Sequence, residues 1–168
     1  MAMALTLKEC GEQHRDIYLY DTYTGMTEPA DADISHNGHV AREVYFQKIV
    51  TDDIVDWCYS PIEEVRENLH TTGYPKERLH FVKGPVEETI PGIMPEKIAI
   101  LRLDTDWYAS TRHEMQHLFP RLVKHGVLII DDYGHWEGAR KAVDEYLEAE
   151  KIRLLLCRVD YTGRIAVK

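Results

Sequence analysis

Short apolar runs alternate with amphipathic helical stretches along most of this chain, and this alternation constrains the fold more than any other feature. An apolar strand is predicted at Ile98–Leu103, a helix at about 110–123, a second strand at 127–130 and a further helix at about 136–150. Strands that alternate with helices form parallel βαβ units. The pattern therefore predicts an α/β fold with a parallel sheet.

Four further strands extend this predicted sheet. We expect strands at Asp16–Tyr20 and Arg78–Lys83, each bounded by turn-forming residues. The last two strands, Ile152–Val159 and Arg164–Val167, are separated by a Tyr-Thr-Gly turn, which predicts an antiparallel hairpin at one edge. Further helices are predicted at residues 2–10, 41–50, 61–69 and 86–89.

Length and charge limit the class of protein. We expect one domain over residues 1–168, with the polar segment 26–50 as a lid or substrate loop. A formal charge of −9 argues against a nucleic-acid partner, and no apolar run reaches the roughly 18 residues of a membrane span. Because Cys10, Cys58 and Cys157 form no CxxC pair, we expect reduced, mostly buried thiols in a cytoplasmic protein without a secretory signal.

Acidic side chains stand where two neighbouring strands of the predicted sheet end. Asp104 follows one strand, and Asp131 and Asp132 follow the next. Ligands of open parallel sheets bind at this edge, and crowded carboxylates raise one another's pKa unless a cation lies between them. Since Mg²⁺ prefers oxygen ligands, we expect a divalent-metal site here, with Asp106 as a helix cap or an outer partner. Simple capping or solvated turns would explain one such aspartate better than three.

Other side chains near these strand ends have two interpretations. Asp21 could accept hydrogen bonds from ribose hydroxyls, or could only hold a turn. Aromatic side chains could wall a pocket for a carbohydrate ring, and Trp136 fits the core equally well. The candidate substrate contacts are Tyr108, Tyr133 and Trp136, with Trp107 and His135 close by.

A second motif points to different chemistry. His113-Glu-Met-Gln-His117 matches HExxH, in which two histidines on one helix face bind zinc. The apolar stripe of this helix defines its buried side, so both histidines are expected to face solvent without a third ligand. The context therefore argues against a zinc protease. The stripe is Met115, Leu118, Phe119 and Leu122, and a Thr111…Glu114 capping box is predicted to begin the helix.

Two longer segments carry a family resemblance. The segment 101–111 reads LRLDTDWYAST, the segment 126–133 reads GVLIIDDY, and the match continues through Ala139–Asp144. With these motifs the sequence resembles the macrocin O-methyltransferase (TylF-like) family of class I methyltransferases. The resemblance implies a Rossmann-like fold, S-adenosylmethionine as cosubstrate, Mg²⁺, and a sugar hydroxyl of a natural product as acceptor.

The resemblance also implies roles for individual residues. Asp104, Asp131 and Asp132 would hold Mg²⁺, and Asp104 would also be the general base. Asp21 and Thr22 would contact the ribose side of S-adenosylmethionine. The loop along the adenine would be formed by Gly84, Pro85 and Val86.

The start of the chain departs from the family pattern. The first strand and its Gly-rich turn, expected between the strands at 16–20 and 98–103, have no counterpart. This predicts either an N-terminally truncated domain or a sheet that closes differently. Two alternatives therefore accompany an enzyme acting on a glycoside. One is a catechol-type O-methyltransferase, and the other is a non-catalytic remnant that binds metal or oligomerises. A homodimer is compatible with each of these interpretations.

Overall fold

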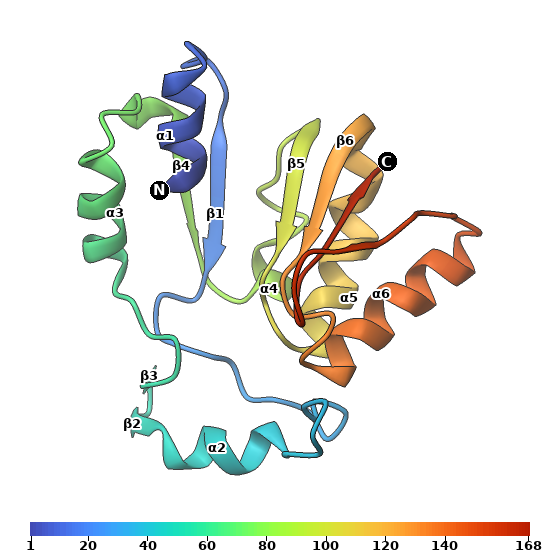
Figure 1. Ribbon diagram of the computed structural model, residues 1–168. Helices are drawn as coiled ribbons and strands as arrows, with labels where there is room; N and C mark the ends of the chain where they lie inside the picture. Colours follow the sequence, from blue (N-terminus) through green and yellow to red (C-terminus); the bar gives the residue numbers. More distant parts are fainter. The chain divides into compact units, whose positions relative to one another are not determined.

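The computed structural model describes residues 1–168, and their contacts divide the chain into two compact units. The first comprises Met1–Thr27 and Lys48–Pro85, and the second comprises Glu28–Gln47 and Val86–Lys168. Figure 1 shows that both units combine helices with strands. The predicted α/β class is confirmed for each.

The first unit is built on two parallel strands. β1 (Ile17–Asp21) pairs with β4 (Leu79–Lys83), in register from Ile17 opposite Leu79 to Asp21 opposite Lys83. Helices α1 (Ala2–Glu9) and α3 (Ile62–His70) supply the apolar side chains of its core, and α3 begins after Pro61. The buried cluster is Ala4, Leu69, Tyr74 and Leu79, against which Leu7, Ile17, Leu19, Val65 and Phe81 pack.

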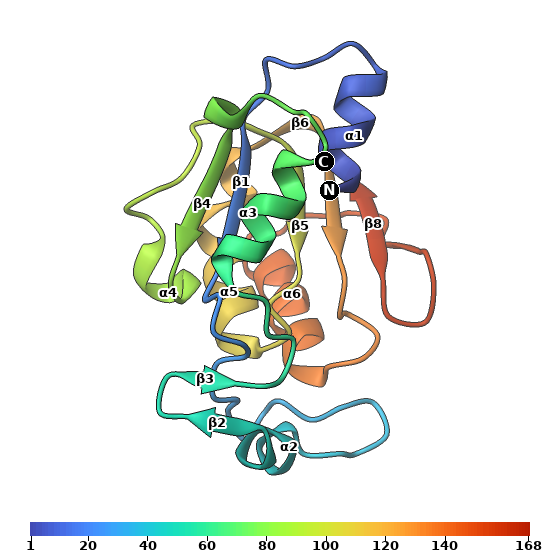
Figure 2. The ribbon, with the colours of Figure 1, turned by 90° about the vertical axis from the view of Figure 1, so that its left-hand side faces the viewer.

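The remaining elements of this unit are short. The strands β2 (Ile49–Thr51) and β3 (Ile54–Val55) form an antiparallel hairpin, which is visible in Figure 2. A single 3₁₀ turn, η1 (Lys76–Arg78), leads into β4. Gly25 has a φ of +96°, and a Cβ there would lie 1.9 Å from the carbonyl oxygen of Val55, so only glycine fits this contact.

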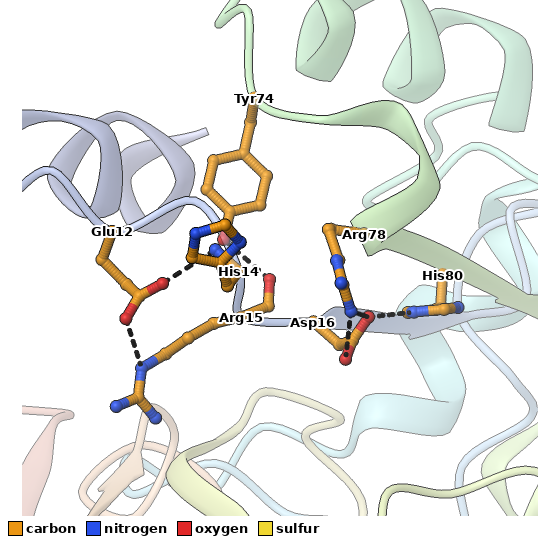
Figure 3. A network of polar contacts seen from close by, with 7 residues as sticks. All are labelled: Glu12, His14, Arg15, Asp16, Tyr74, Arg78 and His80. Atoms are coloured by element: carbon orange, nitrogen blue, oxygen red, sulfur yellow. Dashed lines mark hydrogen bonds and ion pairs between the residues drawn. The ribbon is translucent and has the colours of Figure 1, made fainter.

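Polar contacts fasten the amino end of β1 to β4, as Figure 3 shows. Asp16 accepts a hydrogen bond from His80 at 2.8 Å and pairs with Arg78 at 3.4 Å, and the His80 contact is the main cause that lowers the pKa of Asp16. The Tyr74 hydroxyl donates to the carbonyl oxygen of Arg15 at 2.7 Å. These contacts fix the register of two strands whose opposite ends carry the predicted cosubstrate residues.

The second unit contains a four-stranded sheet in the order β5-β6-β8-β7. β5 (Ile98–Leu103) and β6 (Leu122–Ile130) are parallel, and β8 (Arg164–Val167) runs antiparallel to both β6 and β7 (Cys157–Arg158). The C-terminal antiparallel hairpin is therefore confirmed. β5 pairs only with β6, and β1 pairs only with β4. The missing central strand and the truncated start stay predictions.

Two helices pack together against this sheet. They are α5 (Tyr108–His117) and α6 (Glu137–Ala149), and both lie on the same side of the strands in Figure 1. The shorter elements are α2 (Ala41–Gln47), α4 (Val86–Thr89) and a 3₁₀ turn, η2 (Phe119–Arg121). The largest fully buried side chains of the core include Leu103, Met115, Phe119, Leu122, Leu128, Ile130 and Val143.

The predicted helix over 110–123 is wrong at both ends. It begins at Tyr108 and ends at His117, because Pro120 lacks the N–H that a continuing helix needs. β6 consequently begins at Leu122 instead of 127, while the predicted apolar stripe is still buried. The Thr111…Glu114 capping box does not form, because Glu114 accepts a hydrogen bond from Thr105 instead, at 2.9 Å.

Two further predictions need correction. The strand expected over 152–159 is reduced to Cys157–Arg158, because only this stretch pairs with β8. The three cysteines are free and exposed, not buried. Cys10 ends α1, Cys58 has a φ of +54° in a loop, and Cys157 lies on an edge strand, so none of them points into a core.

A buried carboxylate holds the polar segment Glu28–Gln47 in place within the second unit. Asp33 is fully buried and accepts hydrogen bonds from the backbone N–H groups of Ala30 and Tyr108, both at 2.8 Å. It thereby satisfies a donor in the first turn of α5 that has no partner within the helix. A Cβ on Gly138 would lie 2.2 Å from Asp33, so glycine lets α6 approach. A lid role for the segment stays a prediction.

We expect Asp33→Ala to lower the free energy of unfolding by about 2 kcal/mol, because two N–H groups lose a charged acceptor. Urea denaturation measures this change. Asp31→Ala is the matched control, since the Asp31 side chain is 95% exposed, and its effect should stay within about 0.5 kcal/mol. Equal losses in the two variants would contradict the anchoring role of Asp33.

Candidate functional site

The parallel pairing of β5 and β6 brings the predicted metal ligands together. Leu103 lies opposite Ile130, and the N–H of Asp131 donates to the carbonyl oxygen of Leu103 at 3.0 Å. One carboxylate oxygen from each of Asp104, Asp131 and Asp132 lies within 4.8 Å of the others. These three side chains thus converge as the strand ends predicted.

Asp106 joins them, which makes a carboxylate cluster of Asp104, Asp106, Asp131 and Asp132. Of the two roles expected for Asp106, a helix cap or an outer partner, the helix cap is wrong, because Asp33 caps α5 and Asp106 does not. Asp106 has a φ of +64°, in the left-handed region that few residues other than glycine adopt. Such backbone strain is concentrated at functional sites.

Two carboxyl groups of the cluster have raised pKa values. Burial raises the pKa of Asp104 to about 7, aided by a hydrogen bond shared with Asp131 and opposed by the charge of Arg102. Burial also raises the pKa of Asp106 to about 9, aided by a hydrogen bond that its protonated form shares with Asp132. Burial is the largest cause of both raised pKa values, and the neighbouring carboxylate charges add to it.

One buried oxygen of the cluster has no hydrogen-bond partner. Asp132 Oδ2 is buried and accepts no hydrogen bond. When Asp106 and Asp132 are both ionised, neither can donate a proton to the other, so the buried oxygen is left uncompensated. A hard divalent cation would supply the missing positive partner. The cluster therefore fits such a cation in both charge and ligand type.

Arg102 is a member of the site that the motifs did not single out. Its guanidinium contacts Asp104 at 2.5 Å and Asp131 at 3.1 Å, bridging the ends of β5 and β6. A signal existed in the sequence, because residues two apart on a strand share a face, and Arg102 stands two positions before Asp104.

The predicted cosubstrate residues of the first unit lie together at the carboxyl ends of β1 and β4. Asp21 is exposed, and its Oδ1 accepts from the N–H of Tyr23 at 2.6 Å, so the side chain shapes its own turn. The hydroxyl of Thr22 donates to Gly25 at 2.6 Å. Gly84 has a φ of +133°, and its N–H donates to the Asp21 carbonyl at 3.0 Å.

The other two predicted cosubstrate residues fall on either side of the boundary between the units. Pro85 ends the first unit, and Val86 begins the second. The Val86 side chain is buried at the start of α4, so it is a core residue. Contacts to adenine by this residue would have to use its backbone.

Two of the three candidate substrate residues contact α6, and the third is buried. Tyr108 donates to Glu145 at 2.7 Å, and Tyr133 donates to Asp144 at 2.6 Å, so both hydroxyls are engaged by α6. Trp136 is buried, with its ring centroid 5.0 Å from that of Trp107. Of its two interpretations, the structure places Trp136 in the core.

A different group of rings lies beside the carboxylate cluster. The ring centroid of His135 lies 5.3 Å from that of His36 and 6.0 Å from that of Tyr161. The backbone N–H of His135 donates to the carbonyl oxygen of Asp132 at 3.0 Å. The side chains of His36 and Tyr161 are exposed. The sequence offered no signal for this group, because its members come from three distant segments.

The structure removes the zinc-protease interpretation of HExxH. Glu114 is buried and bonded to Thr105, so it cannot activate a water beside the two histidines. His113 donates from Nε2 to the carbonyl oxygen of Ile90 at 2.9 Å, and no third His, Cys, Asp or Glu ligand joins the pair.

Comparison with solved structures defines the class of fold. The O-methyltransferase NovP superposes with a TM-score of 0.80 at 24% identity, covering 99% of this chain and 65% of NovP. The calicheamicin methyltransferase CalS11 superposes with a TM-score of 0.70 at 20% identity, covering 97% and 65%. The fold is that of the Rossmann-like methyltransferases.

Sequence comparison then defines the family. The family model for Macrocin-O-methyltransferase (TylF) matches residues 1–167, so the chain belongs to the macrocin O-methyltransferase (TylF) family. Among its relatives is the 8-demethyl-8-(2,3-dimethoxy-alpha-L-rhamnosyl)-tetracenomycin-C 4'-O-methyltransferase of Streptomyces olivaceus, 31% identical over 96% of this chain. Another is the mycinamicin III 3''-O-methyltransferase of Micromonospora griseorubida, 28% identical over 94%.

The matches cover only part of each relative. The chain spans 58% of the length of the first relative and 59% of the second.

None of the helices in the structure combines the length and apolar character needed to cross a bilayer.

Buried Glu114 should make the stability of the metal-free protein depend on pH. Burial raises the pKa of Glu114 from 4.5 to about 8, so between these values the folded state holds a proton that the unfolded state has lost. Stability from this group is therefore present at low pH and is lost as the pH rises through about 8. Urea denaturation in chelator should show a smaller decline between pH 5 and 9 for Glu114→Gln than for the wild type.

Glu148→Gln is the control, because Glu148 is exposed on α6 and should leave the decline unchanged. Asp104 and Asp106 contribute to the decline in all three proteins. A Glu114→Gln profile that matches the wild type would show that Glu114 is already ionised in the folded state.

Proposed function

We propose that this chain is the greater part of an O-methyltransferase that moves a methyl group from S-adenosylmethionine to a sugar hydroxyl of a natural-product glycoside. The observation that carries the proposal is the carboxylate cluster at the ends of β5 and β6, in a chain of the TylF family. The name of one relative specifies 4'-O-methylation of a rhamnosyl tetracenomycin, which supports this acceptor class.

Asp104, Asp131 and Asp132 are the proposed ligands of Mg²⁺. Bound there, Mg²⁺ would lower the pKa of an acceptor hydroxyl and fix its orientation. The unpartnered oxygen of Asp132 and the mutual repulsion within the cluster support this assignment. The sulfonium methyl group is already activated, so orientation of the acceptor supplies much of the remaining rate enhancement.

The acceptor hydroxyl must lose a proton as the new C–O bond forms. We assign this proton to Asp104, the carboxylate at the end of β5 that lies beside the other proposed ligands. Asp106 is the competing acceptor, since it adjoins the same cluster and is not one of the three proposed ligands. Asp21 and Thr22 are proposed to contact the ribose, with Gly84, Pro85 and Val86 along the adenine.

Calorimetry with S-adenosylhomocysteine tests the proposal on this chain. We expect saturable binding that is tighter with Mg²⁺ than with chelator. Asp21→Ala should weaken binding roughly 10–100-fold, the loss expected for charged hydrogen bonds. Asp104→Asn should retain binding while losing the Mg²⁺ effect and methyl transfer to a rhamnoside. Asp106→Asn should retain the Mg²⁺ effect.

Three outcomes would count against parts of this proposal. If calorimetry detects no heat of S-adenosylhomocysteine binding at high protein concentration, the result would favour a non-catalytic remnant. Methylation of a catechol but no glycoside would replace the proposed acceptor class. Retained turnover in Asp104→Asn together with lost turnover in Asp106→Asn would transfer the base role to Asp106.

A further inference from the structure

A fixed positive charge lies across the proposed metal ligands. The guanidinium of Arg102 reaches Asp104 with one nitrogen and Asp131 with the other, at 2.5 and 3.1 Å. Arg102 projects from β5, where its backbone lies opposite Ile129 of β6. The side chain therefore joins the ends of the two strands from which the carboxylates emerge.

This ion pair joins one guanidinium to two carboxylates, and the side chains involved are 40–44% exposed. A guanidinium cannot be deprotonated in proteins, and its planar fork suits two carboxylates at once. The pairing thus supplies part of the positive charge that the cluster needs when no metal ion is bound.

We propose that Arg102 is a tethered counter-ion that competes with the divalent cation for Asp104 and Asp131 and so lowers the cation affinity of this site. This inference rests on the proposed metal site. Two effects act in the same direction. Arg102 stabilises the metal-free cluster by offsetting carboxylate repulsion, and it repels a cation bound to the same side chains. Each effect makes cation binding less favourable.

A purely orienting role would have the opposite consequence. If Arg102 only held the two carboxylates in place for the metal ion, its removal would disorder the ligands and weaken binding. The sign of the change in affinity therefore separates a competing role from an orienting role.

Titration of the purified chain with Mn²⁺, followed by calorimetry, tests the inference without any activity measurement. We expect Arg102→Met to bind Mn²⁺ with a Kd at least about tenfold lower than the wild type. In chelator, the melting temperature of Arg102→Met should fall by about 2–4 °C, and saturating Mn²⁺ should recover it. Arg102→Lys keeps the charge and should bind Mn²⁺ nearly as weakly as the wild type.

Arg140→Met is the matched control, because Arg140 pairs with Asp144 on α6 at 3.6 Å and has no contact with the cluster. Its Mn²⁺ affinity should equal that of the wild type. Unchanged or weaker binding by Arg102→Met, with normal binding by the wild type, would overturn the counter-ion role and leave the metal site standing. Absence of Mn²⁺ binding in every variant would overturn the metal site and the inference together.

Discussion

Electrostatic repulsion among carboxylates at adjacent strand ends is the constraint on which the rest of this site depends. The parallel register of β5 and β6 makes the crowding unavoidable, because Leu103 lies opposite Ile130 and an aspartate follows each of them. The molecule responds in three ways: with the guanidinium of Arg102, with raised carboxyl pKa values, and with a buried Asp132 oxygen open to a cation. The guanidinium contact and the open oxygen answer one local excess of negative charge, which also adds to the effect of burial on the pKa values.

The alternation of strands and helices was sufficient to predict the fold class, because each period reports directly on which residues are buried. The exact ends of the helices and strands were harder to predict. Pro120 ended α5 early while the apolar stripe of the helix stayed buried, so the pattern was correct about burial and wrong about conformation. Asp33 was invisible in the sequence, because its role as a cap on α5 depends on a contact between residues 75 positions apart.

The same distinction applies to the site. Asp104 and Asp131 could be predicted to meet, since adjacent parallel strands fix where their ends lie. The contribution of Asp106 depends on one left-handed backbone angle, which no spacing rule supplies, whereas the position of Arg102 two residues before Asp104 was a signal that the motifs did not use. The group of rings around His135 could not be predicted from the sequence, because its members come from separate loops. Motifs therefore located the centre of the site and missed its surroundings.

Anomalous diffraction from crystals grown with Mn²⁺ tests the central claim most directly, because it locates the cation. We expect one strong anomalous peak at about 2.0–2.2 Å from oxygens of Asp104, Asp131 and Asp132, close to the distance at which Mg²⁺ binds oxygen ligands. Well-ordered crystals with Arg102 still bridging Asp104 and Asp131, and with no anomalous density between the three carboxylates, would contradict a metal-dependent site.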